Sequence, residues 1–490
     1  MDRNQGVSRR VILRGSLLGL GVACVPLLQA CGGGAAPTSA ATQPAASTGG
    51  AAHTAATPSA AAAAPTAAKP AAPTGAATVA AAPTAAAQAA PQTSGVVLQA
   101  LWVNQTALLK YFQNFADKQF APAHNGTSVK FEVAPDLLQK LLPSIAAGRP
   151  PDFFRAVNVE IFAQVAANNI IVDLGDLIKR DNYQSYLDTF LPGSLDTGKY
   201  HGKQFGIPIG AHPSSYFLFY NKTAVEKKGF KLNNLSWKWA DYENVAKEMT
   251  DAKNQVFGAW IRTNLEGYLV GVRSMGGDIL DKTGMKSQIA SEPAKRFWNH
   301  VYAMIVAAKA APKPADMANW MQPFADGKVM MANDNGYRES FLRGTVKSFT
   351  FDTFVIPNEG ALPPGALIVD MSPISQASKN RDLAWEWYKS ILTTAEGVRR
   401  VQVAQYIPLP TKEALLAKDA MVSPQYAFYV NQWIAHPPLP APVPANGRAT
   451  EFYNALQKDF DPAWLGTKPL DQVISDVDKE VQSILDKPQV

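Results

Sequence analysis

Cysteine is nearly absent from this chain of 490 residues. The only two, Cys24 and Cys31, both lie near the N-terminus, so residues 96–490 contain no pair that could form a disulfide. This long remainder must therefore be stabilised by a hydrophobic core, and its 395 residues are enough to build one.

The patterns that mark metal and catalytic sites are also missing. The chain has six histidines but no H-E-x-x-H, no C-x-x-C and no clustered Asp/His set. It lacks the G-x-S-x-G of serine hydrolases, and Gly276-Gly277 does not have the spacing of a P-loop or dinucleotide-binding turn. We therefore expect no metal, no cofactor and no catalytic residues.

Positive charge is not concentrated in the long C-terminal part. The net charge is +6, but residues 1–31 contain four arginines against one aspartate, and Lys69 is the one charged residue of 32–95. Residues 96–490 are left with +2, whereas a nucleic-acid-binding protein needs a concentrated basic surface. The sequence argues against that class.

The N-terminal apolar run is too short to cross a membrane. Gly15 to Leu28 comprises fourteen residues, whereas a spanning helix needs about 20. Ser8-Arg9-Arg10-Val11-Ile12-Leu13 precedes it and Leu27-Leu28-Gln29-Ala30-Cys31 ends it. These motifs resemble a twin-arginine (Tat) export signal and a bacterial lipoprotein box. The resemblance implies that 1–31 is a signal peptide and that an acylated Cys31 anchors the protein to the outer face of the cytoplasmic membrane. The alternative is an uncleaved N-terminal anchor.

Residues 32–95 consist almost entirely of Ala, Pro, Thr, Ser, Gly and Gln. Such a segment cannot bury enough apolar surface to offset the entropy of ordering it, and its prolines interrupt the alanine runs. We expect a disordered tether that spans on the order of 45 Å as a flexible coil.

The remaining chain alternates strand-like and helix-like segments. The expected strands are 97–103, 128–133, 153–154, 256–261, 329–332 and 366–371, and the expected helices are 108–120, 137–147, 157–167, 237–250, 265–275, 294–308, 382–392 and 470–485. Strands separated by helices of about a dozen residues indicate parallel βαβ units, in which ligands lie beyond the carboxyl ends of the strands. The pattern predicts an α/β fold.

Lys199 to Lys222 interrupts this alternation. A polar turn at residues 200–203 leads into two short β-rich runs, 205–210 and 216–220, which Gly and Pro interrupt. The stretch predicts either a hinge between two lobes with a binding cleft beside it, or an ordinary hairpin at a domain edge.

An ordered series of segments resembles the extracellular solute-binding proteins of family 1, which are substrate receptors of ABC importers. The segments are 138–152 (LQKLLPSIAAGRPPD), 201–222, 236–246, 275–284 (MGGDILDKTG), 324–332, 378–387 (SKNRDLAWEW), 393–397 and Ile407-Pro408. Together they extend over most of residues 96–490.

The resemblance implies a two-lobed, type II periplasmic-binding-protein-like α/β fold. It places residues 96–207 and 352–400 in an N-terminal lobe and 208–351 and 401–490 in a C-terminal lobe. Gly206, Pro208 and Gly210 become the expected hinge. The implied protein is a monomeric, maltose-binding-protein-like receptor that closes on a sugar or oligosaccharide and delivers it to the transmembrane subunits of a permease. A non-sugar solute, such as a polyol phosphate or polyamine, and a lipid-anchored hydrolase are the alternatives.

Candidate ligand-binding residues are aromatic and polar side chains in or beside the breaks that follow strands. Sugar rings stack on aromatic faces, and their hydroxyl groups pair with planar polar side chains. The candidates are Trp102, Asn104, Asp152, Phe153, Tyr216, Trp260, Arg262, Tyr268, Tyr337 and Asp370.

Several candidates have a structural alternative. Trp102 and Phe153 are equally consistent with core packing, Asp152 with a turn cap and Arg262 with a solvated surface charge. Trp298, Trp385 and Trp387 lie within amphipathic helical patterns, so we expect them to pack in the core.

Overall fold

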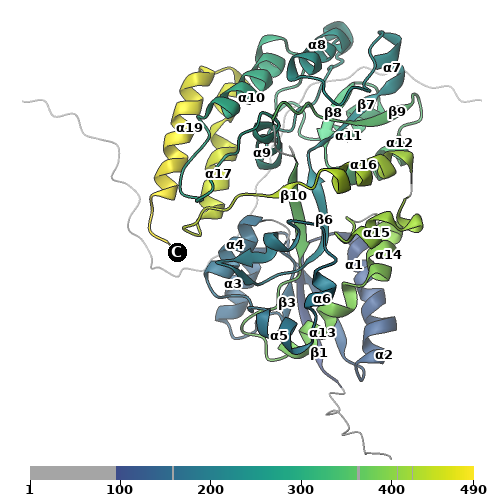
Figure 1. Ribbon diagram of the computed structural model, residues 1–490, viewed down its shortest axis with the longest axis vertical. Coiled ribbons are helices and arrows are strands. Elements are labelled where there is room, and N and C mark those ends of the chain that lie inside the picture. Colours follow the sequence, from purple (N-terminus) through teal and green to yellow (C-terminus); the bar gives the residue numbers. More distant parts are fainter. Residues whose placement is uncertain (1–94, 157–158, 361–364, 405–406, 422, 490) are drawn as a thin grey trace, which may run out of the picture. The chain divides into compact units, whose positions relative to one another are not determined.

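The computed structural model describes residues 95–156, 159–360, 365–404, 407–421 and 423–489 (Figure 1). The chain divides into two units, residues 1–85 and 86–490, and all described residues belong to the second. The signal peptide, the lipidation site Cys31 and almost the whole tether lie outside the described residues, so their predictions stay predictions.

The first sheet has three parallel strands in the order β2-β1-β3. They are β1 (Val97–Trp102), β2 (Ser128–Val133) and β3 (Phe153–Phe154). The helices α1 (Thr106–Phe115), α3 (Leu137–Ala146) and α13 (Arg381–Ile391) lie around this sheet (Figure 1). The prediction of parallel βαβ units is confirmed for these strands.

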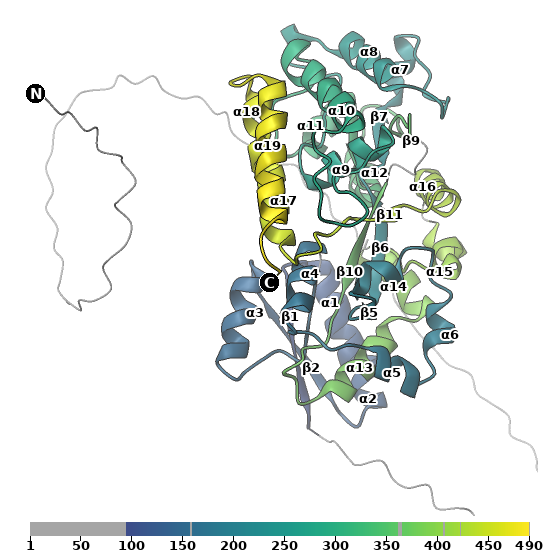
Figure 2. The ribbon, with the colours of Figure 1, turned by 60° about the vertical axis from the view of Figure 1, so that its left-hand side comes forward.

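The second sheet is antiparallel, in the order β8-β7-β9. It consists of β7 (Phe217–Asn221), β8 (Met331–Asp334) and β9 (Phe351–Val355). All five residues of β7 are buried, as expected for a central strand covered on both faces. In both views α8 (Trp239–Met249) and α10 (Glu292–Tyr302) lie on the side of β7 away from the first sheet (Figures 1 and 2).

Two long strands run between these sheets along the middle of the ribbon (Figure 1). β6 (Pro208–Ser214) pairs antiparallel with β10 (Ala366–Met371), and β11 (Leu439–Pro440) pairs parallel with β10. A hairpin of β4 (Lys199–Tyr200) and β5 (Lys203–Gln204) precedes β6. Its two turn residues both have positive φ, the conformation that a two-residue hairpin turn requires.

The other helices cover the sheets and connect their strands. The α-helices are α2 (Ala121–Ala123), α4 (Val159–Ala167), α5 (Gly175–Arg180), α6 (Gln184–Leu187), α7 (Lys222–Lys227), α9 (Leu265–Ser274), α11 (Met321–Ala325), α12 (Glu339–Thr345), α14 (Thr394–Ala404), α15 (Lys412–Leu416), α16 (Pro424–Ala435), α17 (Ala449–Asp459), α18 (Asp461–Leu465) and α19 (Leu470–Leu485). The 3-10 segments are η2 (Leu195–Gly198), η3 (Ala252–Asn254), η5 (Gly336–Arg338) and η6 (Lys418–Ala420), and the π-helical ones are η1 (Ala116–Phe120) and η4 (Ala303–Ala307).

Helix α19 has the predicted bounds. Its buried residues, Val473, Val477, Val481 and Ile484 among them, recur every three or four positions. Both views show α19 beside α17 (Figures 1 and 2).

The strand expected at 256–261 does not form. Phe257 and Trp260 make single bridges to Val329 and Ala332, but between them the N–H of Ala259 donates to Ala310 O at 3.0 Å. The ladder is therefore interrupted, and the neighbouring strand, expected at 329–332, is β8 at Met331–Asp334.

The expected lobe boundaries at 352 and 401 also need correction. Every residue of β9 pairs with β7, so residues 352–355 belong with the second sheet. Helix α14 continues to Ala404, and Ile407 and Leu409 pack in the hydrophobic cluster around β1. The chain therefore leaves the second sheet only after residue 355 and leaves the cluster around β1 no earlier than residue 409, in both cases later than the sequence suggested.

Candidate functional site

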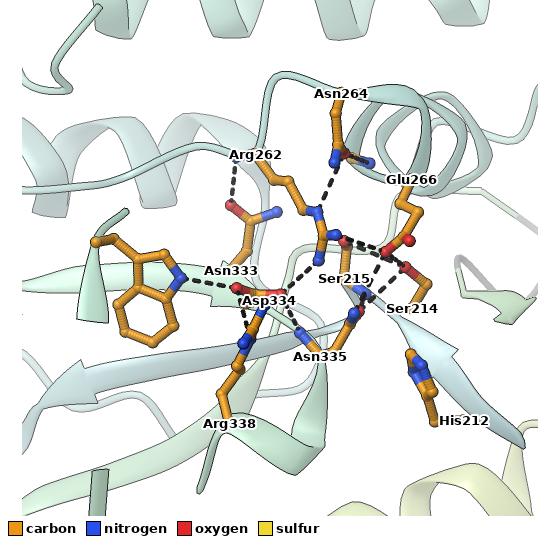
Figure 3. Close-up of polar contacts among 12 residues, drawn as sticks. His212, Ser214, Ser215, Arg262, Asn264, Glu266, Asn333, Asp334, Asn335 and Arg338 are labelled. Carbon is orange, nitrogen blue, oxygen red and sulfur yellow. Dashed lines mark hydrogen bonds and ion pairs between the residues drawn. The ribbon is translucent and has the colours of Figure 1, made fainter. Parts of the chain in front are cut away.

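A set of polar residues gathers where β6, β8 and the segment before α9 meet (Figure 3). We call this set the polar cluster. Its members are Ser214, Ser215, Arg262, Asn264, Glu266, Asn333, Asp334, Asn335 and Arg338.

Arg262 holds the polar cluster together. Its guanidinium group pairs with Asp334, lies 2.9 Å from Glu266 Oε2 and donates from Nε to Asn264 Oδ1 at 3.1 Å. Burial acts to lower the Arg262 pKa, but Glu266 and Asp334 outweigh burial and raise it. The arginine is therefore a fixed positive charge, and 13% of its side chain remains exposed.

Glu266, in the first turn of α9, and Asn335, just after β8, connect these elements to the end of β6. Glu266 Oε2 lies 2.5 Å from Ser214 Oγ and 3.3 Å from Asn335 Nδ2, and Asn335 Oδ1 accepts the Ser215 N–H at 2.8 Å. Glu266 retains 24% of its side-chain exposure. The cluster thus presents carboxylate and guanidinium groups in fixed positions, a set that can pair with hydroxyl groups.

Asp334 is the most enclosed carboxylate of the polar cluster. Trp320 Nε1 donates to its Oδ2 at 2.7 Å, and Arg338 Nε lies 3.5 Å from the same oxygen. Trp260 packs beside Trp320, with ring centroids 6.0 Å apart, and donates from Nε1 to Met317 O. The indole of Trp260 is therefore half-buried at the margin of the cluster.

Tyr337 lies between the second sheet and the first. It follows β8 in the chain, yet it packs against the hydrophobic cluster around β1. Its ring is 5.3 Å from His212, and the Arg338 guanidinium lies 4.8 Å from its centroid. A side chain added at Gly336 would come within 2.1 Å of Tyr429, so glycine allows this turn to approach α16.

His212 is buried on β6 next to the polar cluster. Burial lowers its pKa to about 4, and Arg262 acts in the same direction, whereas Glu266 and Asp334 act to raise it. The imidazole is therefore neutral at pH 7, with one ring nitrogen that donates a hydrogen bond and one that accepts.

The depressed pKa of His212 predicts that the protein loses stability as the pH falls from about 6.5 toward about 4. In that window the unfolded chain binds a proton that the folded state excludes, so acid favours unfolding. Urea unfolding of the parent and of His212→Gln at pH 7 and pH 4.5 would measure this. The His212→Gln variant should lose less stability on acidification than the parent does. Equal pH dependence in parent and His212→Gln would contradict the assignment.

The structure brings two of the predicted ligand residues together, Arg262 and Tyr337, whereas Trp260 packs on Trp320. Asn104 is exposed just beyond β1. Among the other aromatic candidates, four are buried in the core: Trp102, Phe153, Tyr216 and Tyr268. Packing accounts for them, which corrects their assignment as ligand-facing residues.

Their neighbours explain this burial. Trp102 packs edge-to-face on Phe112, and Phe153 stacks on Trp387. The Tyr268 hydroxyl accepts a hydrogen bond from Trp464 Nε1 at 2.7 Å. As expected, Trp298, Trp385 and Trp387 are core residues too.

The two aspartate candidates have structural partners. Asp152 accepts hydrogen bonds from Gln99 N at 2.7 Å and Ser378 Oγ at 2.6 Å, so it joins β1 to the segment before α13. Asp370 is buried in an ion pair with Arg155. Both carboxylates are paired with other groups of the protein. This corrects their assignment as ligand contacts.

The expected hinge residues lie at close contacts between segments. A side chain at Gly206 would meet Met371 Sδ at 2.7 Å, and one at Gly210 would meet Ile407 at 2.6 Å. Neither glycine has positive φ, so they are needed for close approach rather than for an unusual backbone. Their role as a hinge, with Pro208, stays a prediction.

Sequence reasoning missed Glu266, Asp334 and Arg338 as members of the site. A usable signal was present, because Asn333-Asp334-Asn335 directly follows the apolar run 329–332, and Asn264 and Glu266 flank the start of α9. Polar runs at strand ends mark loops as readily as sites, however, and only the contacts separate the two.

The described part of the chain contains no group of three His, Cys, Asp or Glu residues placed to hold a metal ion. None of its helices is both long enough and apolar enough to span a membrane.

Comparison with known proteins gives a consistent picture. The family model described as bacterial extracellular solute-binding protein matches residues 102–398. Among solved structures, the ABC substrate-binding protein Lmo0181 from Listeria monocytogenes, in complex with cycloalternan, is 20% identical with a TM-score of 0.69, and the match covers 79% of this chain and 98% of that one.

Two further structures agree with this fold. The GacH receptor of Streptomyces glaucescens, solved unliganded and with acarbose, is 18% identical with a TM-score of 0.67, and 80% of this chain and 99% of that chain are covered. Maltose-bound T. maritima MalE3 is 19% identical with a TM-score of 0.66, and the coverage is 80% and 100%.

Proposed function

The chain belongs to the bacterial extracellular solute-binding proteins and has their two-lobed, type II periplasmic-binding-protein fold, and on that premise we propose that it captures a sugar or oligosaccharide outside the cell. It would deliver this ligand to the transmembrane subunits of an ABC importer. The family and its structural neighbours are binding proteins, and the family's extracellular description implies export.

The polar cluster is the observation that carries the sugar assignment. It places the partly exposed Arg262 and Glu266 near Tyr337, whose ring packs beside His212 at the end of β6. Charged and amide groups suit sugar hydroxyls, and aromatic faces suit the C–H faces of sugar rings. The neighbours solved with cycloalternan, acarbose and maltose bind ligands of this chemistry.

The charges of the cluster favour a neutral ligand over the charged alternatives. Arg262 and Arg338 balance Asp334 and Glu266, and ion pairs join them. A polyamine needs surplus carboxylates and a polyol phosphate needs surplus cations. The polar cluster has neither surplus carboxylates nor surplus cations. A receptor for a polyamine or for a polyol phosphate is therefore the weaker alternative.

Ligand capture would proceed by a shift between open and closed arrangements of the lobes. We place the hinge at Gly206, Pro208 and Gly210. The two other segments that pass between the lobes would follow β9 and α14. A ligand that contacts both lobes only in the closed state stabilises that state, and a permease can recognise it. Tyr337, which lies between the sheets, would respond to such a motion.

We further propose that the protein is exported through a Tat-type signal and held at the membrane by lipid on Cys31. The motifs in residues 8–31 support this. Cys31→Ala should abolish metabolic labelling with a fatty-acid probe and release the protein from the membrane fraction. Unchanged labelling would overturn the anchor.

Isothermal titration of the purified folded domain against a panel of mono- and oligosaccharides tests the sugar assignment. Mass spectrometry of ligand retained through purification would narrow the panel. A saturable heat with one or more sugars is the expected result. Heat only with peptides, polyamines or phosphate esters would overturn it.

A further inference from the structure

A groove of about 1220 Å³ lies on the first sheet, away from the polar cluster. It is lined by parts of β1 and β2, the later part of α3, residues 147–152 and residues 377–380. None of its lining residues belongs to the polar cluster. The groove is therefore separate from the candidate sugar site.

The groove exists because helices cover only one face of the sheet near the start of β1. On that face, Leu98 and Val129 are buried in the hydrophobic cluster around β1. Side chains alternate along a strand, so Gln99 and its cross-strand partner Lys130 point to the opposite face, and both are exposed. Parallel sheets are normally covered on both faces. Within the described chain, this part of the second face has no covering element.

Two carboxylates line the groove, and both already have partners. Glu132 Oε1 lies 2.7 Å from Lys140 Nζ. Asp152 is buried and, besides the two hydrogen bonds described above, accepts one from Asn380 Nδ2 at 3.1 Å. Neither carboxylate is paired with the other cations of the groove.

Those cations are Lys130 on β2, Arg149 after α3 and Lys379 before α13. All three are exposed, and none forms an ion pair with another residue that the structure describes. They come from three separate segments, which the fold brings to one groove. With four cations and two carboxylates in its lining, the groove has a net positive charge of two.

Apolar side chains accompany these charges. Val97 keeps 44% of its surface exposed, and Pro143 and Ala377 are exposed too. The volume exceeds that of a pocket for a drug-sized ligand, roughly 300–1,000 Å³, so it is much larger than one inorganic anion needs. Cations attract anionic lipids, and apolar side chains enter the boundary between headgroups and acyl chains.

We propose that this groove binds the headgroups of anionic phospholipids, with Lys130, Arg149 and Lys379 beside their phosphate groups. The alanine- and proline-rich segment 32–95 contains no carboxylate, so charge does not favour it as the occupant. Val97 lines the groove, and the chain before it leads to Cys31. A consequence, that the first lobe lies on the membrane, rests on the proposed lipid anchor, whereas the binding of headgroups does not.

Sedimentation with vesicles tests the groove in the full chain carrying Cys31→Ala, which has no acyl group. We expect binding to phosphatidylglycerol vesicles that weakens as salt is added, and little binding to phosphatidylcholine vesicles. Lys130→Gln/Arg149→Gln/Lys379→Gln should lower the partition coefficient on phosphatidylglycerol roughly 100-fold, because each cation near an anionic membrane contributes about fivefold. Residues 1–31 are the same in every variant, so the difference reports the groove.

The matched control replaces three exposed lysines outside the groove, Lys231→Gln/Lys253→Gln/Lys458→Gln, and should partition like the parent. Equal partitioning of the two triple variants would overturn the groove as a lipid site, as would equal binding of the parent to both kinds of vesicle. Displacement from the vesicles by an equal concentration of inorganic phosphate would assign the groove to a free anion and overturn the lipid. Loss of the anchor in the fatty-acid labelling experiment would overturn only the orientation of the lobe.

Discussion

Asp370→Ala is expected to lower the free energy of unfolding by about 3–5 kcal/mol, because it leaves a buried guanidinium group without its carboxylate. Arg155 and Asp370 have side-chain exposures of 2% and 1%. Arg155 Nε lies 3.1 Å from both carboxylate oxygens, and Nη2 also contacts Oδ2. The pair links the end of β3 to β10. Its loss should therefore also loosen the junction between the first sheet and the strands β6 and β10.

A matched control exists in the same protein. Asp352 pairs with Lys222 at 3.0 Å on β9, but the two side chains keep 30% and 37% exposure. Asp352→Ala should therefore cost no more than about 1 kcal/mol in the same urea-unfolding measurement. The double variant Arg155→Met/Asp370→Leu should recover much of the stability that Asp370→Ala loses, since it removes both charges. Equal losses for Asp370→Ala and Asp352→Ala would contradict the buried-pair argument.

Arg262→Met is expected to weaken the binding of the sugar identified in the titration panel by about 10- to 100-fold. The change removes a charged donor and leaves Glu266 and Asp334 without the cation that orders them. Arg262→Lys keeps the charge but lacks the planar guanidinium group that reaches Asp334, Glu266 and Asn264 together. Its affinity for the sugar should therefore lie between that of the parent and that of Arg262→Met. Titration calorimetry measures both variants.

Arg399→Met is the control for this result. Arg399 pairs with Glu396 at 3.4 Å, with 49% of its side chain exposed, far from the polar cluster in the sequence. Its affinity for the sugar should equal that of the parent. Thermal unfolding of each variant separates a loss of binding from a loss of folded protein. Parent-like affinity in a folded Arg262→Met variant would remove Arg262 from the binding site.

The candidate site could be predicted from the sequence only in part. Arg262 and Tyr337 were selected because they follow apolar segments. The same rule selected Trp102 and Phe153, which lie in the core. An apolar pattern reports that a side chain is buried, but it does not say whether a neighbouring helix or a ligand covers it. Here Phe112 and Trp387 cover them.

The partners of the charged residues could not be predicted from the sequence either, because they lie far apart in the chain. Asp370 lies 215 positions from Arg155, and Asp334 lies 72 from Arg262. No local pattern relates residues so far apart. A buried carboxylate therefore looks identical in the sequence whether it stabilises the fold or faces a ligand.

The sequence by itself determined the elements whose signals are local. The parallel strands of the first sheet, helix α19 and the hairpin before β6 follow from side-chain periodicity and from turn residues that accept positive φ. Tertiary structure decided which polar residues meet near the end of β6 and where β9 belongs. These features depend on contacts between distant segments, and such contacts exist only once the chain has packed.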